Sequence, residues 1–377
     1  MTDLERPPVR PVDAEPMPPA LRRPTEGLTT RDRLLSAVAV VLALIALAIS
    51  GSPLIILRAT EVAAFIVAFS GLHILSGRLG LISVGHGAFI GIGAVAAAHA
   101  IDDLSVPYLL APLAGAAGAA LFGVVIGVPS LRLPGSYLAL LTLAVAMVLP
   151  IGLRQLDGPL GYRVEGDLIP PAWTGLAPGD DEIWQFALVL VVGAFIMAVV
   201  HGTVRGRFTR ALVAVRDEPT AAAAFGLNVA RIHLTGVAIS AGLAGAAGGL
   251  ILYASPLVAG EQYPFSLSVA MFALMVALGA SKLWTSVPAA LTVVLLPELL
   301  VRAGQAVWEP IVYGMVLLIM TRLSRGRGLV SLWEPKPNAI VSDRAGPPAN
   351  KRPPGQPRPQ HSGNPWLLTP EPPSTQS

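Results

Sequence analysis

Residues 239–254 read ISAGLAGAAGGLILYA, an uncharged run in which most side chains are glycine or alanine. A similar run, APLAGAAGAALFGVVIG, occupies residues 111–127. Small side chains let helix backbones approach one another closely, which matters in a membrane because no hydrophobic force draws helices together there. We therefore expect both runs to form helices of a packed bundle rather than single membrane anchors.

The chain as a whole has the composition of a membrane protein. Of its 377 residues, 53% are hydrophobic and only 13% are charged, and the mean hydropathy is +0.65. Apolar runs recur at lengths near the ~20 residues that a helix needs to cross the hydrocarbon layer. The predicted fold is an all-α, polytopic transmembrane helical bundle of about eight to ten spans. The candidate spans are Leu34–Ile56, Thr60–Ser76, Leu79–Ile101, Val106–Leu131, Ser136–Leu153, Ile183–Val204, Ile232–Ala254, Phe265–Ser281, Leu283–Ala303 and Val307–Thr321.

The two ends of the chain differ from its apolar middle. Residues 1–30 and 333–377 are dense in proline and poor in large apolar side chains, so they bury too little surface to offset the entropy of ordering. Both are predicted to be disordered tails around a transmembrane domain at residues 31–332. The polar start is not the pattern of a cleaved signal peptide, so the first apolar run is expected to be a retained span.

The placement of basic residues predicts the orientation. With ten spans, the basic residues of both tails and of the links at Arg78, Arg132, residues 207–233 and Lys282 fall on one side. Lysine and arginine concentrate on the cytoplasmic side, so both termini of this multi-pass protein are expected in the cytoplasm, beneath the plasma (inner) membrane. Acidic residues gather in the loop at residues 154–182, which is either a solvated loop or a docking surface for an extracytoplasmic protein.

Several kinds of chemistry lack their sequence signatures. The chain contains no cysteine, so neither a disulfide nor a thiolate metal site can form. It has no GxxxxGK[ST] phosphate loop, no HExxH pattern and no GxSxG pattern. We therefore expect a protein that is not an enzyme on its own, with no cofactor and with lipid rather than nucleic acid around it.

One charged island interrupts the apolar sequence, RFTRALVAVRDEPTAAAAFGLNVARIH at residues 207–233. Within it, Asp217 and Glu218 precede Pro219, which suits the first turn of a helix because its φ is already helical and acids favour that end of the dipole. Alanines then favour the helix, and Gly226 can close it in the left-handed conformation. A helix of about two turns is marginal alone. It either sits in a groove of a partner protein or packs on its own bundle.

Polar residues within the apolar runs are the other candidates for function, because ionisable groups in spans usually face the bundle interior or a wet path. His86 lies between Gly85 and Gly87 and near Ser83, and this stretch could either expose backbone to a zwitterionic solute or let another helix approach. The alternative is a neutral histidine that is hydrogen-bonded to a neighbouring helix. Glu298 either pairs across helices or lines the path. His73 and His99, near predicted span ends, are expected at the membrane interface.

Three ordered motifs resemble one family. RALVAVRDEPTAAAAFGLNVARIHLTGVAISAGLAGAAGGL, residues 210–250, resembles the cytoplasmic loop and following span of permease subunits in ATP-driven importers of branched-chain amino acids. GRLGLISVGHGAFIGIGA, residues 77–94, and RLPGSYLALLTLA, residues 132–144, are similar to two further family segments, and GRGLVSL at residues 326–332 partly matches a closing motif. The likeness runs from about residue 59 to 332 and is greater to the longer, M-type permease of the pair.

This resemblance implies an assembly and a role for the island. The chain would pair with a second, related permease, two ATP-binding subunits would dock below, and an extracytoplasmic solute-binding protein would deliver substrate from above. The loop at residues 205–231 would carry a coupling helix seated in a cleft of an ATPase subunit, with Arg216 as a partner for an acidic group there. The residues that match or flank the family's loop motif are Arg216, Asp217, Pro219, Ala222, Ala223, Ala224 and Gly226.

The sequence departs from the family pattern at three places. Leu81 stands where glutamine is more usual, Val95 where tyrosine is usual, and LGASKLWTSVP, residues 278–288, replaces a glycine-rich stretch. These changes affect the expected substrate more than the expected fold. Two other functions remain open: an importer of the same type for urea or short amides, and a stand-alone secondary transporter.

Overall fold

The computed structural model describes residues 53–131, 137–157, 161–164, 181–280 and 282–323, all within one compact unit. The two proline-rich tails and most of the first candidate span, Leu34–Ile56, lie outside these residues. So do most of the loop at 154–182 and the closing motif at 326–332.

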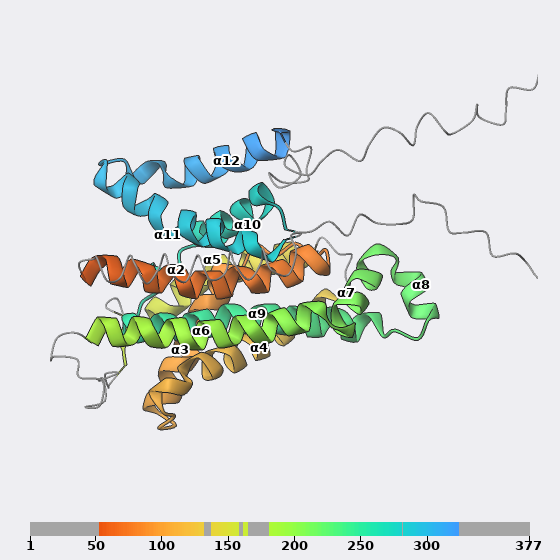
Figure 1. Cartoon of the computed structure of the whole chain (residues 1–377), viewed down its shortest axis with the longest axis horizontal. Coiled ribbons are helices and arrows are strands. Elements are labelled where there is room, and N and C mark those ends of the chain that lie inside the picture. The colour runs from red at the N-terminus through yellow and green to blue at the C-terminus, as the bar shows by residue number, and fades with distance from the viewer. Residues whose placement is uncertain (1–52, 132–136, 158–160, 165–180, 281, 324–377) are drawn as a thin grey trace, which may run out of the picture. The chain divides into compact units, whose positions relative to one another are not determined.

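Helices make up almost all of the described chain, so the prediction of an all-α bundle is confirmed (Figure 1). A single antiparallel strand pair is present among these residues, β1 (Tyr162–Arg163) with β2 (Leu257–Val258). The α-helices are α2 (Pro53–Leu72), α3 (His86–Asp102), α4 (Ala111–Ser130), α5 (Tyr137–Asp157), α6 (Asp181–Arg205), α7 (Arg207–Asp217), α8 (Pro219–Ala224), α9 (Val229–Ala254), α10 (Phe265–Leu278), α11 (Ser286–Arg302) and α12 (Glu309–Leu323). Short helical turns are η2 (His73–Arg78, a π-helix), η3 (Tyr108–Leu110), η5 (Gly260–Gln262), η6 (Leu283–Thr285) and η7 (Ala306–Trp308).

Seven helical segments of the described chain are long and apolar enough to cross a membrane. Two further helices, α3 with 17 residues and α12 with 15, coincide with predicted spans but are shorter. The chain is therefore a multi-pass membrane protein, with a span count close to the prediction. The seven segments are Pro53–Arg78, Tyr108–Ser130, Leu138–Gln155, Asp181–Thr203, Val229–Ala254, Gly260–Leu278 and Leu283–Arg302.

The predicted span Leu79–Ile101 is wrong in its first third. Residues 79–85 are not helical, and α3 begins only at His86. Gly80 has a φ of +75°, in the left-handed region that a continuing helix cannot use. The α2–η2 span and α3 are thus joined by a non-helical segment, which we call the 79–85 segment.

Helix α9 is the centre of the bundle and packs on α2, α3 and α4 (Figure 1). Its contacts with α3 and α4 are made by glycines of α3 and of the runs at residues 111–127 and 239–254. A Cβ on Gly93 would lie 2.1 Å from the Cα of Gly245, and a Cβ on Gly245 would lie 2.2 Å from the Gly115 carbonyl oxygen. The expectation that small residues bring these backbones together is therefore confirmed.

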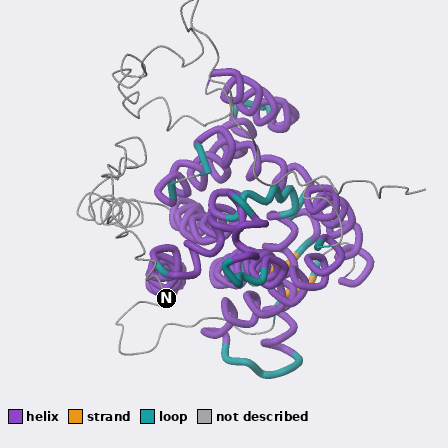
Figure 2. The backbone as a smooth tube through the Cα atoms, turned by 90° about the vertical axis from the view of Figure 1, so that its right-hand side faces the viewer, coloured by secondary structure: helices purple, strands orange, loops and turns teal. Residues whose placement is uncertain are grey.

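Viewed along the helices, the bundle shows tubes grouped side by side, with the strand pair among them (Figure 2). Helices α7 and α8 differ, since they extend beyond one end of α6 and α9 (Figure 1). The strand pair belongs to the connections at the other end of α9, whose last residue, Ala254, lies three positions before β2. The charged island therefore occupies one end of the bundle and the strand pair the other.

Candidate coupling loop and translocation site

Helix α8 is the short helix that the charged island predicts. Glu218, with φ −153° and ψ 88°, ends α7, and Pro219 opens α8 in its first turn. The helix closes with Gly226 at a φ of +84°. The amide of Leu227 donates to the Ala222 carbonyl (3.1 Å) and that of Gly226 to the Ala223 carbonyl (2.9 Å). This pair of bonds is a Schellman closure, which satisfies carbonyls at the end of a helix and favours glycine at this position.

Most of α8 faces away from the bundle. Ala222 is its one buried residue, at 5% exposure, and it joins a small apolar cluster with Leu212 and Val215 of α7. Phe225 directly after the helix is 88% exposed, and Ala223 and Ala224 are exposed as well. Thus α8 rests on its own bundle through a single alanine, and it presents a small-residue surface with one large aromatic ring to its surroundings.

Arg216 ties the end of α7 to the neighbouring span. Its Nη1 donates to the Gly77 carbonyl (3.0 Å), while Nε and Nη2 donate to Asp217 Oδ1 (3.0 and 2.8 Å). Its aliphatic stem covers Gly80, where a Cβ would lie 2.6 Å from Arg216 Cγ. The guanidinium that was predicted to meet an acidic group of an ATPase is therefore already bonded within the chain, at η2 and beside the 79–85 segment.

His86, the first residue of α3, is buried at 1% exposure. Its Nε2 lies 3.0 Å from the carbonyl oxygen of Ala68 on α2. A carbonyl only accepts, so Nε2 carries the proton, as the hydrogen-bonded alternative expects. Ser83 is fully buried, and its Oγ and the other ring nitrogen of His86 have no hydrogen-bond partner within the described structure. Gly85 lies against Thr142, because a Cβ on Gly85 would be 2.5 Å from the Thr142 carbonyl oxygen.

Glu298 belongs to a different part of the bundle. Its carboxylate accepts from Arg58 Nη2 (2.9 Å) and Arg302 Nε (2.9 Å), and Arg58 also binds Glu61 (2.8 Å). This is the pairing across helices that the sequence left as one alternative. Arg58 precedes Ala68, the partner of His86, by ten residues of α2, which is about 15 Å along the helix. The structure therefore does not bring Glu298 together with His86.

His73 lies near the end of the Pro53–Arg78 segment, as expected, but its side chain faces the protein interior. Its side chain is buried at 4% exposure, with Nδ1 2.9 Å from the Ala280 carbonyl and Nε2 3.0 Å from Thr285 Oγ1. The link between α10 and α11 packs over this histidine, and its turn is made possible by Gly279 at a φ of +98°. His99, by contrast, is 45% exposed in its side chain and lies 3.1 Å from Asp103.

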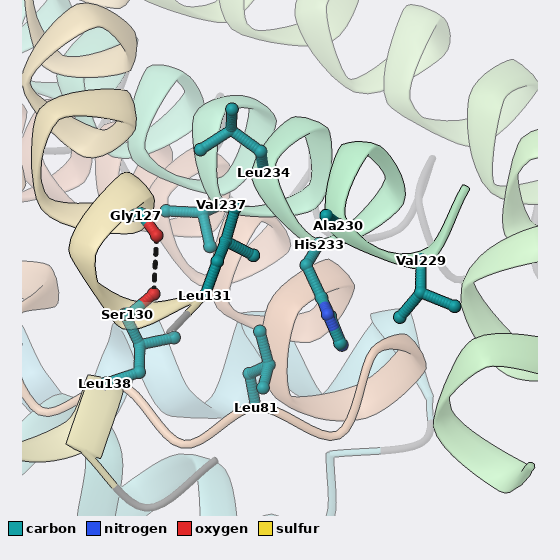
Figure 3. Close-up of a pocket in the computed structure, with 10 residues that line it drawn as sticks. All are labelled: Leu81, Gly127, Ser130, Leu131, Leu138, Val229, Ala230, His233, Leu234 and Val237. Carbon is teal, nitrogen blue, oxygen red and sulfur yellow. Dashed lines mark hydrogen bonds between the residues drawn. The ribbon is translucent and has the colours of Figure 1, made fainter. Parts of the chain in front are cut away.

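A cavity of about 340 Å³ lies next to the 79–85 segment (Figure 3). Leu81 borders it on one side and Leu138 of α5 on another, and His233 is the ionisable residue in its wall. No sequence pattern indicates this cavity, because its walls come from four separate segments. The lining residues are Leu81, Gly127, Ser130, Leu131, Leu138, Val229, Ala230, His233, Leu234 and Val237.

Metal chemistry finds no support within the described ranges, where no group of three or more histidine, aspartate or glutamate side chains could hold an ion. Two features stand out instead: α8, which is mostly exposed, and the start of α3, which is buried beside polar atoms without partners. They are connected through Arg216 and the 79–85 segment.

Comparison with known proteins identifies what the bundle is similar to. Residues 54–321 match the family described as branched-chain amino acid transport system / permease component. The chain is 27% identical over 302 residues to the high-affinity branched-chain amino acid transport system permease protein LivM of Salmonella typhimurium, covering 74% of this chain and 70% of that protein. The LivM protein of Escherichia coli gives the same identity and coverage. No solved structure matches the chain significantly.

Proposed function

The chain belongs to the family of permease components of branched-chain amino acid transport systems, and we propose that it is the translocation subunit of an ATP-driven importer for these amino acids. The family match covers the whole described bundle except its first and last residues. The names of the two LivM relatives support the amino-acid substrate. ATP is bound and hydrolysed by separate subunits, and this chain supplies the path and no cofactor of its own.

The observation that carries the coupling role is the state of α8. A capped helix whose alanines and aromatic neighbour face outward leaves apolar surface without a partner in its own chain. Phe225 and the exposed alanines suit a groove on an ATP-binding subunit, while Asp217 and Glu218 place negative charge at the helix start. On this proposal α8 is the coupling helix, and Gly226 sets its end.

Arg216 gives this helix a mechanical connection to the membrane domain. It joins α7 to the Gly77 carbonyl and covers Gly80, so a displacement of α7 and α8 acts on η2 and on the 79–85 segment. That segment leads directly to His86 at the start of α3. A rigid-body movement of the coupling loop therefore changes the position of the chain around Ser83, Gly85 and His86, which we assign to the translocation path.

The assembly around this chain contains a second, related permease, two ATP-binding subunits and an extracytoplasmic solute-binding protein. Both termini and α8 lie in the cytoplasm, and the strand pair at the far end of the bundle faces the binding protein. At that end Tyr162 donates to Asp102 (2.6 Å) and Arg154 pairs with Glu261 (2.8 Å). These contacts fasten the outer connections of α3, α5 and α10 to one another.

Uptake into vesicles that contain the chain, its ATP-binding subunits, a second permease and a binding protein tests the proposal. We expect ATP-dependent accumulation of labelled leucine and valine, and no accumulation without the ATP-binding subunits. Accumulation of urea in place of leucine would assign the chain to the importer of urea or short amides. Counterflow of solute by the purified chain alone would show a secondary transporter.

A further inference from the structure

Helix α3 begins inside the bundle rather than at its end. Its first residue, His86, contacts the carbonyl of Ala68, which is ten residues from the Arg78 end of the span Pro53–Arg78, or about 15 Å along it. Gly87 on the next position faces Ser268, which is ten residues from the end of α10 at Leu278. Both neighbours place the start of α3 about 15 Å inside the same end of the bundle.

A helix that begins at this depth needs partners for its first amide groups. The first N–H groups of a helix have no acceptor within the helix and carry the positive end of its dipole. The residue before α3 is Gly85, which has no side chain to cap them. Non-helical backbone at such depth is tolerated only where protein buries it or where it lines a path.

Three side chains with an unpaired polar atom lie in this helix start, just before it in the chain, or against it. Ser83 Oγ, Ser268 Oγ and the Nδ1 of His86 are buried in side chains of at most 1% exposure, and none of the three atoms has a hydrogen-bond partner in the described structure. Ser268 Oγ points at the first turn of α3, since it lies 2.8 Å from where a Cβ on Gly87 would be. Burying such groups unpaired destabilises a protein, so their gathering at one helix start points to a ligand that pairs with them.

The unpaired groups at the start of α3 favour both a negatively charged and a positively charged partner. The hydroxyls of Ser83 and Ser268, together with the amides at the α3 start, donate hydrogen bonds and favour a negative charge. His86 donates through Nε2 to Ala68, so in the neutral ring Nδ1 is an acceptor and favours a donor such as an ammonium group. Donors for an anion beside an acceptor for a cation match a zwitterion rather than a single ion.

We infer that the start of α3, with Ser83, His86 and Ser268, is a binding subsite for the charged head of an α-amino acid as it crosses the membrane. The substrate carboxylate binds at the two serine hydroxyls and the α3 amides, and its ammonium group donates to His86. The inference rests on the proposed function, which it extends by naming the residues that recognise the head group. In the conformation described here the subsite is closed, because all three side chains are buried.

The matched controls follow from the same structure. Ser70 is also fully buried in a span, but its Oγ donates to the Val67 carbonyl (2.6 Å) of its own helix, so Ser70→Ala removes a hydroxyl that already has a partner. Replacing an unpaired hydroxyl by hydrogen leaves thermal stability unchanged or raises it, whereas loss of a structural hydroxyl lowers it. A drop in transport without a drop in stability therefore distinguishes substrate binding from packing.

The experiment compares the complete transporter with its Ser83→Ala/Ser268→Ala and Ser70→Ala forms in vesicles, with saturating leucine-loaded binding protein. We expect the double variant to lose at least roughly tenfold in leucine uptake per ATP hydrolysed, because two hydrogen bonds to a charged group are removed, and to keep its melting temperature and its stimulated ATPase rate. Ser70→Ala is expected to keep its uptake.

Two results would overturn the inference: uptake per ATP in the double variant equal to that of Ser70→Ala, or a loss of uptake that matches a fall in melting temperature. Absence of leucine uptake by the unmodified transporter is a different outcome. It would overturn the proposed function, and with it the subsite.

Discussion

The contact of α9 with α3 and α4 and the loop of α7 and α8 are two ways of holding a helix. In the first, glycines such as Gly93 and Gly245 bring backbones so close that a single added carbon has no space. In the second, α8 is held by one buried alanine, the bonds of Arg216 and its glycine closure. The centre of the bundle is thus a rigid body, while the coupling loop is attached at few points and displays most of its surface.

This difference suits a membrane domain whose movement is driven by a partner protein bound at α8. A tightly packed core has low compressibility and transmits displacement instead of absorbing it. A helix with few contacts to its own bundle can bind a partner without first losing many contacts. If the comparison is correct, substitutions in the two regions should affect different quantities: stability in the core, and coupling in the loop.

The largest effect is expected from Gly93→Leu. Its side chain would have to occupy the space of the Gly245 backbone, 2.1 Å from the new Cβ, so α3 and α9 must separate. Overpacking of a core commonly costs about 1–3 kcal/mol, and backbone against backbone leaves no side chain to yield. We expect little or no monodisperse protein in detergent by size-exclusion chromatography.

The control for this substitution is Gly152→Leu in α5, where nothing lies within 4 Å of an added Cβ. It should give normal yields and a normal melting temperature. A well-behaved, fully stable Gly93→Leu protein would show that the core is not as rigid as the comparison requires.

An intermediate effect is expected from Ala222→Arg in the coupling loop. The arginine side chain cannot remain in the apolar cluster with Leu212 and Val215. Helix α8 therefore loses its contact with α7, while the bundle stays folded. The melting temperature of the purified chain should change by at most a few degrees, whereas co-purification of the ATP-binding subunits should fall at least roughly tenfold, about 1.4 kcal/mol. Ala222→Ser, which nearly fits the same space, should retain both, and equal ATPase binding by the two variants would contradict the role of α8.

The smallest effect on stability is expected from Arg216→Met, which keeps the stem over Gly80 but removes the bond to the Gly77 carbonyl. Because the arginine is partly exposed, we expect a loss of about 1 kcal/mol or less in stability. The ATP-binding subunits should still bind, but leucine uptake per ATP hydrolysed should fall. Arg231→Met, at an exposed arginine elsewhere in the island, is the control, and the two variants would behave alike if Arg216 has no part in transmission.

The sequence predicts the closely packed helices and the short helix α8 well, because both are encoded locally. The runs at 111–127 and 239–254 identify the closely packed helices, and Pro219, the alanines and Gly226 define α8 nearly to the residue. Local sequence patterns give wrong helix bounds where contacts with distant segments determine the structure. Hydropathy extends the third predicted span back to Leu79, but the turn at Gly80, which the Arg216 side chain covers, delays the helix to His86.

Other details depend on partners that are far away in the chain. His73 is buried because Ala280 and Thr285 arrive from more than 200 positions later. Glu298 on α11 is paired because Arg58, 240 positions earlier on α2, donates a hydrogen bond to it. Ser268 shows no special pattern in its own run, and only the fold places it against Gly87. The sequence therefore indicates Ser83 and His86 as candidates but not Ser268.

The most direct test of the account uses the absence of cysteine from the chain, which makes single-cysteine labelling unambiguous. Ala223→Cys on exposed α8 and Leu104→Cys, 74% exposed near the opposite end of the bundle, are each prepared in the complete transporter in sealed vesicles of known sidedness. We predict that the Ala223→Cys protein reacts with an impermeant maleimide only from the cytoplasmic side, is protected by the ATP-binding subunits and crosslinks to them. The Leu104→Cys protein should react from the other side and should not crosslink. Labelling of position 223 from outside, or equal labelling with and without the ATP-binding subunits, would contradict it.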